Sequence, residues 1–263
     1  MPLEAIRQLT SAGYAVIDLE TTGLNPSDST ILEIGVLLVK DGVLVNSGSR
    51  LVATAVPPEI TRITGITQAE VDQLGGSLKE ALDWLCELAG DLPAVGHNYL
   101  RFDGDFIATA ALKTGNKAAA RLALPARVVD TAAIYKGRAM GLKKAANQSL
   151  ANYQQFVLDQ RVPGLRYALQ VACAALTVDV RDCHAHRALG DVTMTQRLYQ
   201  ALVAPAPVVT GVYPSKPHSP EKSSALGSSA ERTESVGSPL GPSETILKPR
   251  GLLSRLTEWL HLG

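Results

Sequence analysis

Apolar runs near the start of the chain predict three successive β-strands. Tyr14–Leu19 is the first run and Ile31–Val39 is the second, and the Asp-Gly pair at 41–42 is a tight-turn signal that leads into Val43–Val52. Strands that follow one another through short turns pair as antiparallel neighbours. The first part of the chain is therefore expected to form one half of a sheet.

Farther along, helical periodicity alternates with short apolar runs. Ser77 and Asn98 are each expected to cap a helix whose apolar positions recur every three or four residues. Strands are expected at Leu92–Val95 and at Arg127–Val129, and Asp130 then caps a helix. Further helices are predicted at about 165–176 and 186–202. This order predicts an α/β fold for residues 1–204, with a mixed sheet flanked by helices.

The end of the chain has a different composition. Pro, Ser and Gly make up 21 of the 46 residues from 205 to 250. Such a segment buries too little apolar surface to offset its chain entropy, so a disordered linker is predicted there. Residues 251–263 predict a short amphipathic helix, with Leu252, Leu256, Trp259 and Leu260 on one face. This helix is either a hook for a partner's groove or a tail that packs back on its own domain.

Composition narrows the class of protein. The chain has 263 residues, 46% of them hydrophobic, with 25 basic and 25 acidic side chains. Because no run of 18 or more apolar residues occurs and the start lacks a charged-then-apolar leader, neither a membrane span nor a secretory signal is expected. A cytoplasmic protein is the expectation. The three cysteines include no C-x-x-C pair, which argues against a disulfide framework or a thiolate zinc site.

The balance of charge hides an uneven distribution. Residues 1–112 carry 6 basic and 15 acidic side chains, whereas residues 113–200 carry 13 basic and 5 acidic ones. The basic positions from Lys113 to Lys144 are interrupted only by Asp130. They are either solvated charges on helix faces or a surface that faces phosphates. Zero net charge therefore does not exclude a nucleic-acid substrate.

Carboxylates at the ends of predicted elements suggest metal chemistry. Asp18 and Glu20 lie two residues apart at the end of the first strand, so both side chains leave the same face of the sheet. An uncompensated buried pair would cost on the order of several kcal/mol, and a metal is the natural compensation. Asp103 and Asp191 fall early in predicted helices, and His186 precedes Asp191 by five residues. The set fits two Mg²⁺ or Mn²⁺ ions with a nearby base for water.

The segments that carry these residues resemble the motif series of a known family. They are 16–24 (VIDLETTGL), 96–103 (GHNYLRFD), 129–131 (VDT) and 186–191 (HRALGD). In this order they are similar to the DEDDh 3′→5′ exonucleases, and among these to the proofreading (epsilon) subunit type of bacterial DNA polymerase III. The resemblance spans residues 14–202. It implies a ribonuclease H-like fold and metal-dependent release of nucleoside monophosphates from DNA 3′ ends.

The resemblance also implies a role for each matching residue. The metal ligands would be Asp18, Glu20, Asp103 and Asp191. His186 would orient and deprotonate the attacking water. The loop 58–67 would cradle the terminal nucleotide, Thr21 would bind the 3′ end through its N–H, and Leu24 would wedge against the bases. The implied substrate-binding set is Thr21, Leu24, Glu59, Thr64, Asn98 and Phe102.

Several positions leave alternatives open. The sister DEDDy class has a tyrosine four residues before the last aspartate, where this chain has Arg187, so the histidine class is favoured. His184 is a second candidate base, although the spacing of His186 matches the motif. Residues 99–101 are bulkier than is usual in the family, and their side chains either narrow the substrate cleft or are turned outward by the helix. Glu33, inside an apolar strand, is either another ligand or a hydrogen-bonded structural carboxylate, and His97 is expected to be a structural hydrogen-bonding residue.

Three functions follow from these features. The first is a proofreading exonuclease that acts on single-stranded DNA or frayed 3′ ends, with residues 251–263 bound to a polymerase or replication factor. The second is a free-standing nuclease that acts in repair or on RNA ends. The third is an inactive scaffold or binding protein of the same fold. The complete set of metal-ligand and base positions argues against the third.

Overall fold

The computed structural model describes residues 2–204 and 251–261. The chain forms two units, residues 1–204 with 249–263 and residues 205–248. The second unit lies outside the described residues, as does the disordered linker predicted for 205–250. Within the described ranges, no helix is long and apolar enough to cross a membrane.

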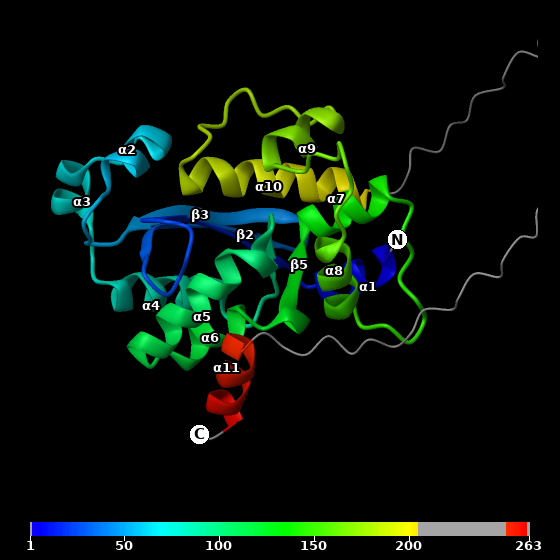
Figure 1. Cartoon of the computed structure of the whole chain (residues 1–263), viewed down its shortest axis with the longest axis horizontal. Helices are drawn as coiled ribbons and strands as arrows, with labels where there is room; N and C mark the ends of the chain where they lie inside the picture. The colour runs from blue at the N-terminus through cyan, green and yellow to red at the C-terminus, as the bar shows by residue number, and fades with distance from the viewer. Residues whose placement is uncertain (1, 205–250, 262–263) are drawn as a thin grey trace, which may run out of the picture. The chain divides into compact units, whose positions relative to one another are not determined.

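One five-stranded sheet forms the centre of the first unit, in the order β3-β2-β1-β4-β5 (Figure 1). β1 pairs antiparallel with β2, and β2 with β3, whereas β4 runs parallel to both β1 and β5. This confirms the mixed sheet and the antiparallel hairpins predicted from the first three apolar runs. The strands are β1 (Tyr14–Thr21), β2 (Ile31–Lys40), β3 (Val43–Leu51), β4 (Ala94–Gly96) and β5 (Val128–Asp130).

Helices cover both faces of this sheet (Figure 1). α10 lies along one face with α7 and α9, and α4, α5 and α6 cover the other. The α-helices are α1 (Leu3–Leu9), α2 (Pro58–Thr64), α3 (Gln68–Leu74), α4 (Leu78–Ala89), α5 (Asp103–Thr114), α6 (Lys117–Leu122), α7 (Thr131–Ala139), α8 (Leu150–Asp159), α9 (Leu169–Ala175), α10 (Ala188–Val203) and α11 (Gly251–His261). Two short 3₁₀ turns are η1 (Tyr99–Arg101) and η2 (Pro125–Arg127).

Strand β1 divides the core into two halves. Ala15 and Ile17 point into the cluster shared with α4, α5 and α6, whereas Tyr14 and Val16 point into the cluster shared with α10. Side chains of a strand alternate between the two faces of the sheet. Asp18, an even-numbered neighbour of Val16, is therefore on the face that α10 covers.

Helix ends agree with the sequence analysis at two caps and differ at a third. Ser77 forms a capping box with Glu80, and the Asp130 side chain accepts the N–H of Ala133 at the start of α7. Asn98 makes no side-chain cap hydrogen bond. It has φ 60°, the left-handed region, and is followed by η1, so α5 begins at Asp103 rather than directly after Asn98. The sequence analysis assigned a helix to 98 onward because it did not foresee this turn.

Other differences concern short helices. Residues 58–67, treated as a loop in the sequence analysis, contain α2 and the start of the segment leading to α3. The helix predicted near 165–176 covers only Leu169–Ala175, and the one predicted at 186–202 begins at Ala188. Short helices of six or seven residues carry too few apolar repeats for periodicity to identify them.

α11 packs against α5 and α6 of the same unit. Leu256 is fully buried in the core cluster of that face, and Leu252, Trp259 and Leu260 pack beside it. The amino group of Lys117 lies 5.5 Å from the centre of the Trp259 ring, a cation–π distance. In this structure the apolar face predicted from the sequence is covered by the chain's own domain.

Candidate active site and metal centre

Three of the predicted metal ligands come together at the carboxyl end of β1. One carboxylate oxygen each from Asp18, Glu20 and Asp191 lie within 4.8 Å of one another. Asp18 and Glu20 share the face of β1 that α10 covers, and Asp191 is in the first turn of α10. Half-buried carboxylates this close repel one another unless a cation lies between them.

Asp103 lies beside this group, on the first residue of α5. Its Oδ1 accepts the backbone N–H of Leu19 at 3.0 Å, and Leu19 is the residue between Asp18 and Glu20. The side chain is almost fully buried, with 3% of the residue exposed. The charges of Asp18 and Asp103 interact closely enough that Asp103 raises the pKa of Asp18. The fourth predicted ligand is thus held against the strand that carries the first two.

The protonation of these carboxyls reflects burial and mutual repulsion. Burial, followed by the charges of Asp103, Asp191 and Glu20, raises the pKa of Asp18 well above its ordinary value. Burial and then Asp191 raise the pKa of Glu20 to about 8. Burial raises the pKa of Asp191 to about 6, although His186 acts to lower it. A divalent cation bound among these oxygens would lower the pKa values and favour the charged carboxylates, which are the hard ligands such a cation prefers.

His186 is exposed and lies two residues before α10. Its backbone has φ 60°, and its N–H donates to Asp191 Oδ2 at 3.3 Å. This contact keeps the histidine beside the carboxylate cluster. The alternative candidate, His184, has an exposed side chain, and its backbone carbonyl lies against Gly190 in the first turn of α10.

The segment that carries His186 is held by an ion-pair network centred on Glu33. Glu33 is 1% exposed and lies on β2. Its carboxylate accepts the N–H of Ala188 at 3.1 Å, the Ser49 hydroxyl at 2.8 Å and the Arg187 guanidinium at 3.2 and 3.3 Å. Arg187 also pairs with Glu70 on α3 at 3.0 Å. Every acceptor position of Glu33 is therefore used structurally, as one of the two sequence interpretations expected.

Gly35 allows α10 to approach the sheet next to the site. It is directly opposite Asp18 in the pairing of β1 and β2. A Cβ at position 35 would lie 2.5 Å from the carbonyl carbon of Ala188. The residue after Arg187 therefore packs directly on the β2 backbone. The sequence analysis did not identify Gly35 or Arg187 as structural residues. Two signals were available in the sequence: Arg187 is next to the motif histidine, and Glu33 is a lone acid in the apolar strand that also contains Gly35.

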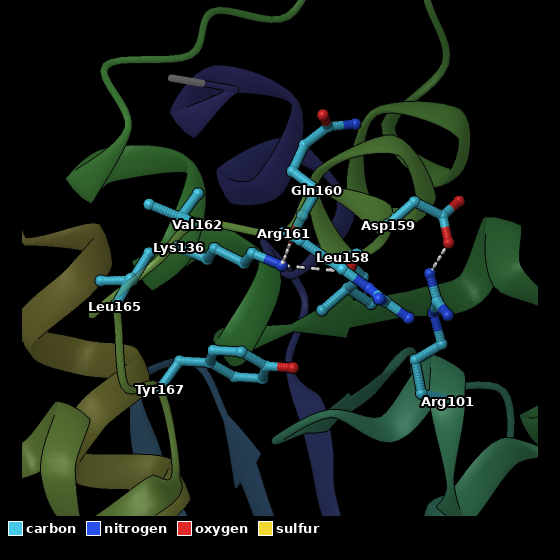
Figure 2. Close-up of a pocket in the computed structure, with 9 residues that line it drawn as sticks. All are labelled: Arg101, Lys136, Leu158, Asp159, Gln160, Arg161, Val162, Leu165 and Tyr167. Carbon is cyan, nitrogen blue, oxygen red and sulfur yellow. Dashed lines mark hydrogen bonds and ion pairs between the residues drawn. The ribbon is translucent and has the colours of Figure 1, made fainter.

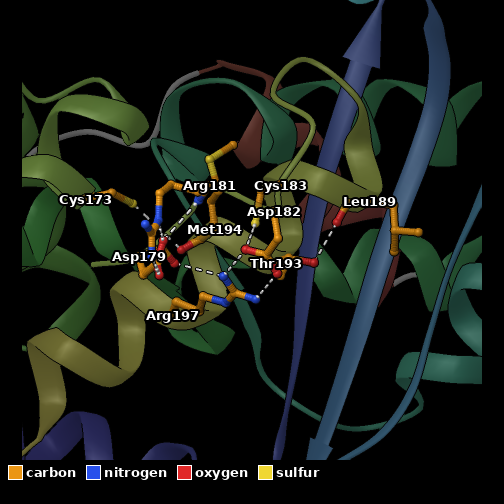
Figure 3. A network of polar contacts seen from close by, with 9 residues as sticks. All are labelled: Cys173, Asp179, Arg181, Asp182, Cys183, Leu189, Thr193, Met194 and Arg197. Carbon is orange, nitrogen blue, oxygen red and sulfur yellow. Dashed lines mark hydrogen bonds and ion pairs between the residues drawn. The ribbon is translucent and has the colours of Figure 1, made fainter. Parts of the chain in front are cut away.

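A second network fixes the chain before His186 (Figure 3). Arg197, on α10, donates to both carboxylate oxygens of Asp182 at 2.6 and 2.8 Å and to the Asp179 carbonyl at 2.8 Å. Arg181 pairs with the Asp179 side chain. These contacts join the 179–183 turn to the helix that carries Asp191, at the surface of the protein.

The implied substrate-binding residues are divided between two parts of the molecule. Thr21 is buried at the end of β1, where its hydroxyl donates to the Gly23 carbonyl at 2.6 Å, and Leu24 is 87% exposed beside it. Glu59 is exposed on α2, whereas Thr64 is buried at its end and donates to the Ile60 carbonyl. Leu24 is therefore an exposed apolar side chain, in the segment that follows β1; its role as a wedge against bases stays a prediction.

Asn98 and Phe102 lie in the turn that precedes Asp103. The Asn98 N–H donates to Asp130 Oδ1 at 3.1 Å, and the Phe102 ring packs on Phe106 with ring centres 4.9 Å apart. Asp130 also accepts the N–H of Leu100, so it fixes the turn that leads into α5. Its role is therefore to hold the backbone that precedes Asp103.

His97 joins the ends of β4 and β5 to a more distant segment. Its Nε2 lies 2.7 Å from the Tyr167 carbonyl, and its Nδ1 lies 2.9 Å from the Thr131 hydroxyl. Burial lowers the pKa of His97 to about 4, so the ring is neutral at physiological pH and its Nε2 carries the proton donated to the carbonyl. The predicted structural role of His97 agrees with these contacts.

Comparison with known proteins defines the class. Residues 15–199 match the exonuclease family RNase_T, and the chain belongs to this family. Family members generally use divalent metals, and the acidic triad described above is present here.

Among curated relatives, the DNA polymerase III subunit epsilon of Aquifex aeolicus is 29% identical over 197 residues, which cover 73% of this chain and 80% of the relative. A PolC-type DNA polymerase III of Clostridium perfringens is 40% identical over 96 residues, 36% of this chain. Another, from Caldanaerobacter subterraneus, is 28% identical over 188 residues, 71% of this chain. The matched segments span only 6% and 11% of these two polymerases.

Solved structures share the fold. E. coli Exonuclease I in complex with a dA16 oligonucleotide has a TM-score of 0.52 at 18% identity, covering 73% of this chain and 40% of that one. A product-bound exonuclease I gives a TM-score of 0.54 at 16% identity, covering 73% of this chain and 43% of that one. The ribonuclease H-like exonuclease fold implied by the sequence motifs is confirmed.

Proposed function

We propose that this protein is a metal-dependent 3′→5′ exonuclease that releases nucleoside monophosphates from DNA 3′ ends. The observation that carries the proposal is the convergence of Asp18, Glu20 and Asp191, with Asp103 alongside and His186 tied to Asp191. Such a set supplies oxygen ligands and a general base from separate elements. The relative named epsilon and the DNA-bound structural neighbour support DNA as the substrate.

Each residue has a definite task in this proposal. Asp18, Glu20, Asp103 and Asp191 would hold two Mg²⁺ or Mn²⁺ ions. Bound there, the metals would activate water and stabilise the leaving 3′ oxygen. His186 accepts the proton of the attacking water, and its exposed ring can then pass that proton to solvent. Leu24 and Phe102 would offer apolar surfaces to the terminal bases, a sequence-tolerant mode of binding.

The test compares Asp18→Ala with a matched control, Glu87→Ala, which removes an exposed carboxylate from α4. With Mg²⁺ or Mn²⁺, the wild type and the control should release mononucleotides from a 3′-labelled single strand. Asp18→Ala should be at least about 100-fold slower, because each tenfold in rate corresponds to about 1.4 kcal/mol and a lost ligand costs several. Mispaired duplex ends and RNA are tested in parallel. Activity that survives Asp18→Ala, or that persists undiminished in a chelator, would contradict the proposal.

We propose further that α11 binds a polymerase or another replication factor. Support comes from the epsilon relative and from the apolar face of α11, but Leu256 on that face is fully buried on the chain's own domain. A partner must therefore displace α11 from α5 and α6. Deletion of 251–263 should leave the exonuclease rate intact and remove co-purification with a polymerase. Unchanged recovery of the polymerase would contradict this part alone.

A further inference from the structure

A basic pocket lies apart from the carboxylate cluster, between α7, the end of α8 and η1 (Figure 2). Its volume is about 460 Å³. Its polar and aromatic lining consists of Arg101, Lys136, Asp159, Gln160, Arg161 and Tyr167. This size is within the range of small-molecule sites, so the pocket can admit one nucleotide unit with its phosphate.

The lining carries more positive than negative charge. Three of its side chains are cationic, and Asp159, which pairs with Arg101, is the single carboxylate among the lining residues. Lys136 is 2% exposed, and its amino group donates to the carbonyls of Leu158, at 3.0 Å, and Gln160. These partners accept two of its three N–H groups without neutralising its charge. An anion that enters the pocket would supply the missing negative charge.

One wall of the pocket is built around Tyr167. The Lys136 amino group lies 4.9 Å from the centre of the Tyr167 ring, and the Tyr167 carbonyl is the partner of His97 Nε2. Arg161 is exposed at the opening, where a ligand can reach it. The buried Lys136 therefore forms part of the wall of the pocket, and the exposed Arg161 is the side chain that can move to contact a ligand.

The pocket and the carboxylate cluster lie along the same edge of the sheet. β1, β4 and β5 are parallel, so their carboxyl ends meet at one edge. The cluster follows β1, whereas Arg101 follows β4 and Lys136 lies on the helix that follows β5. Arg101, on the wall of the pocket, lies two residues before Asp103, the fourth predicted ligand. Ligands of open α/β sheets bind along this edge.

We propose that the pocket binds a backbone phosphate of the substrate strand, on the 5′ side of the bond that is cleaved. The inference rests on the proposed exonuclease function. Arg161 pairs with the phosphate at the opening, and the buried charge of Lys136 attracts it electrostatically. The same phosphate chemistry is offered by a released nucleoside monophosphate, so the test separates these two sources.

The experiment uses the full chain with Arg161→Ala and Arg161→Glu. The matched control is Arg166→Ala, an exposed arginine of the same segment that does not line the pocket. Two substrates are compared: a long single strand, and the p-nitrophenyl ester of thymidine 5′-monophosphate, which has no upstream phosphate. KM for the long strand should rise about 3- to 10-fold in Arg161→Ala and further in Arg161→Glu, with kcat unchanged and the ester unaffected. The slope of log KM against log salt should fall by about 0.7, the value for one phosphate contact on a single strand.

Two results would overturn the inference. KM and salt slope equal to those of Arg166→Ala would show that no phosphate binds at Arg161. If Arg161→Ala weakens inhibition by thymidine monophosphate without changing KM for the long strand, the pocket binds the released product instead. Failure of the exonuclease proposal is distinct from both, because then the wild type cleaves neither substrate.

Discussion

The two halves of the carboxylate site are held in different ways. Asp18 and Asp103 belong to a half built on backbone: one is inside a central strand, and the other accepts the N–H of Leu19 from that strand. His186 and Asp191 belong to a half at the start of α10, which side-chain ion pairs connect to the sheet through Arg187 and Glu33. Asp103 in the first half is buried and His186 in the second is exposed, whereas Asp18 and Asp191 are both half-buried.

This difference determines how readily a side-chain substitution can disturb the geometry of each half. Backbone hydrogen bonds in a paired strand persist when side chains change, whereas the second half depends on a few named side chains. Buried ion pairs lose much more when one partner is removed than they contribute when both are present. We therefore expect substitutions outside the proposed ligand set to affect the position of His186, the proposed base, more readily than the position of Asp18.

The largest expected effect is on stability and comes from His97, which lies just before the turn that leads to Asp103 in the backbone-held half. Its pKa is lowered by burial from 6.5 to about 4, so between these values the unfolded chain binds more protons than the folded one. The free energy of unfolding should therefore fall as the pH drops from about 6.5 to 4, by about 3 kcal/mol from this group. His97→Gln cannot titrate and should lose this pH dependence, as measured by urea unfolding across the range.

A neighbouring group acts in the opposite direction. Burial raises the pKa of Asp130 to about 6, so its contribution to stability grows as the pH falls. Since the variant retains Asp130, the difference between wild type and His97→Gln isolates the histidine. The control His184→Gln removes an exposed histidine and should keep the wild-type profile. Parallel pH profiles of unfolding free energy for wild type and His97→Gln would show that the lowered pKa of His97 does not cause the pH dependence.

A smaller effect, on kcat, is expected from a substitution in the half at the start of α10. Glu33→Gln keeps the shape of the side chain but leaves Arg187 without its buried counter-charge. Groups that orient ligands and bases typically change activity by 10- to 100-fold, so we expect a loss of about that size in kcat with little change in KM.

Glu70→Gln is the matched control, because it removes the half-exposed partner of Arg187 and leaves the buried one. It should cost less than Glu33→Gln, since partly exposed ion pairs contribute little. Circular dichroism and the unfolding midpoint establish that both variants are folded. Equal kcat values for the two variants would show that Glu33 has no special part in positioning His186.

Much of the fold followed from local patterns in the sequence. The apolar runs of β1 and β2 and the caps Ser77 and Asp130 depend on residues close together in the chain, so pattern and spacing identified them. The carboxylates of the site were proposed because they end predicted elements and because their motifs resemble those of a family.

What the sequence left open depends on contacts between distant residues. Glu33 and Arg187 are separated by 154 positions, and nothing local indicates that they pair. The left-handed turn at Asn98 is fixed by Asp130, on another strand. Likewise, the amphipathic pattern of α11 identified an apolar face but not its occupant, which is a helix pair in the same unit.

The absence of a side chain at Gly35 has a consequence for how the site tolerates change. A methyl group there would occupy space 2.5 Å from the carbonyl carbon of Ala188, directly across from Asp18. α10 would have to move outward, while catalytic constellations require placement within about 0.5 Å. Gly35 thus sets how closely α10 approaches the sheet: all the proposed metal ligands and the proposed base could remain in the sequence, and one added carbon atom at position 35 would still displace the helix that carries Asp191.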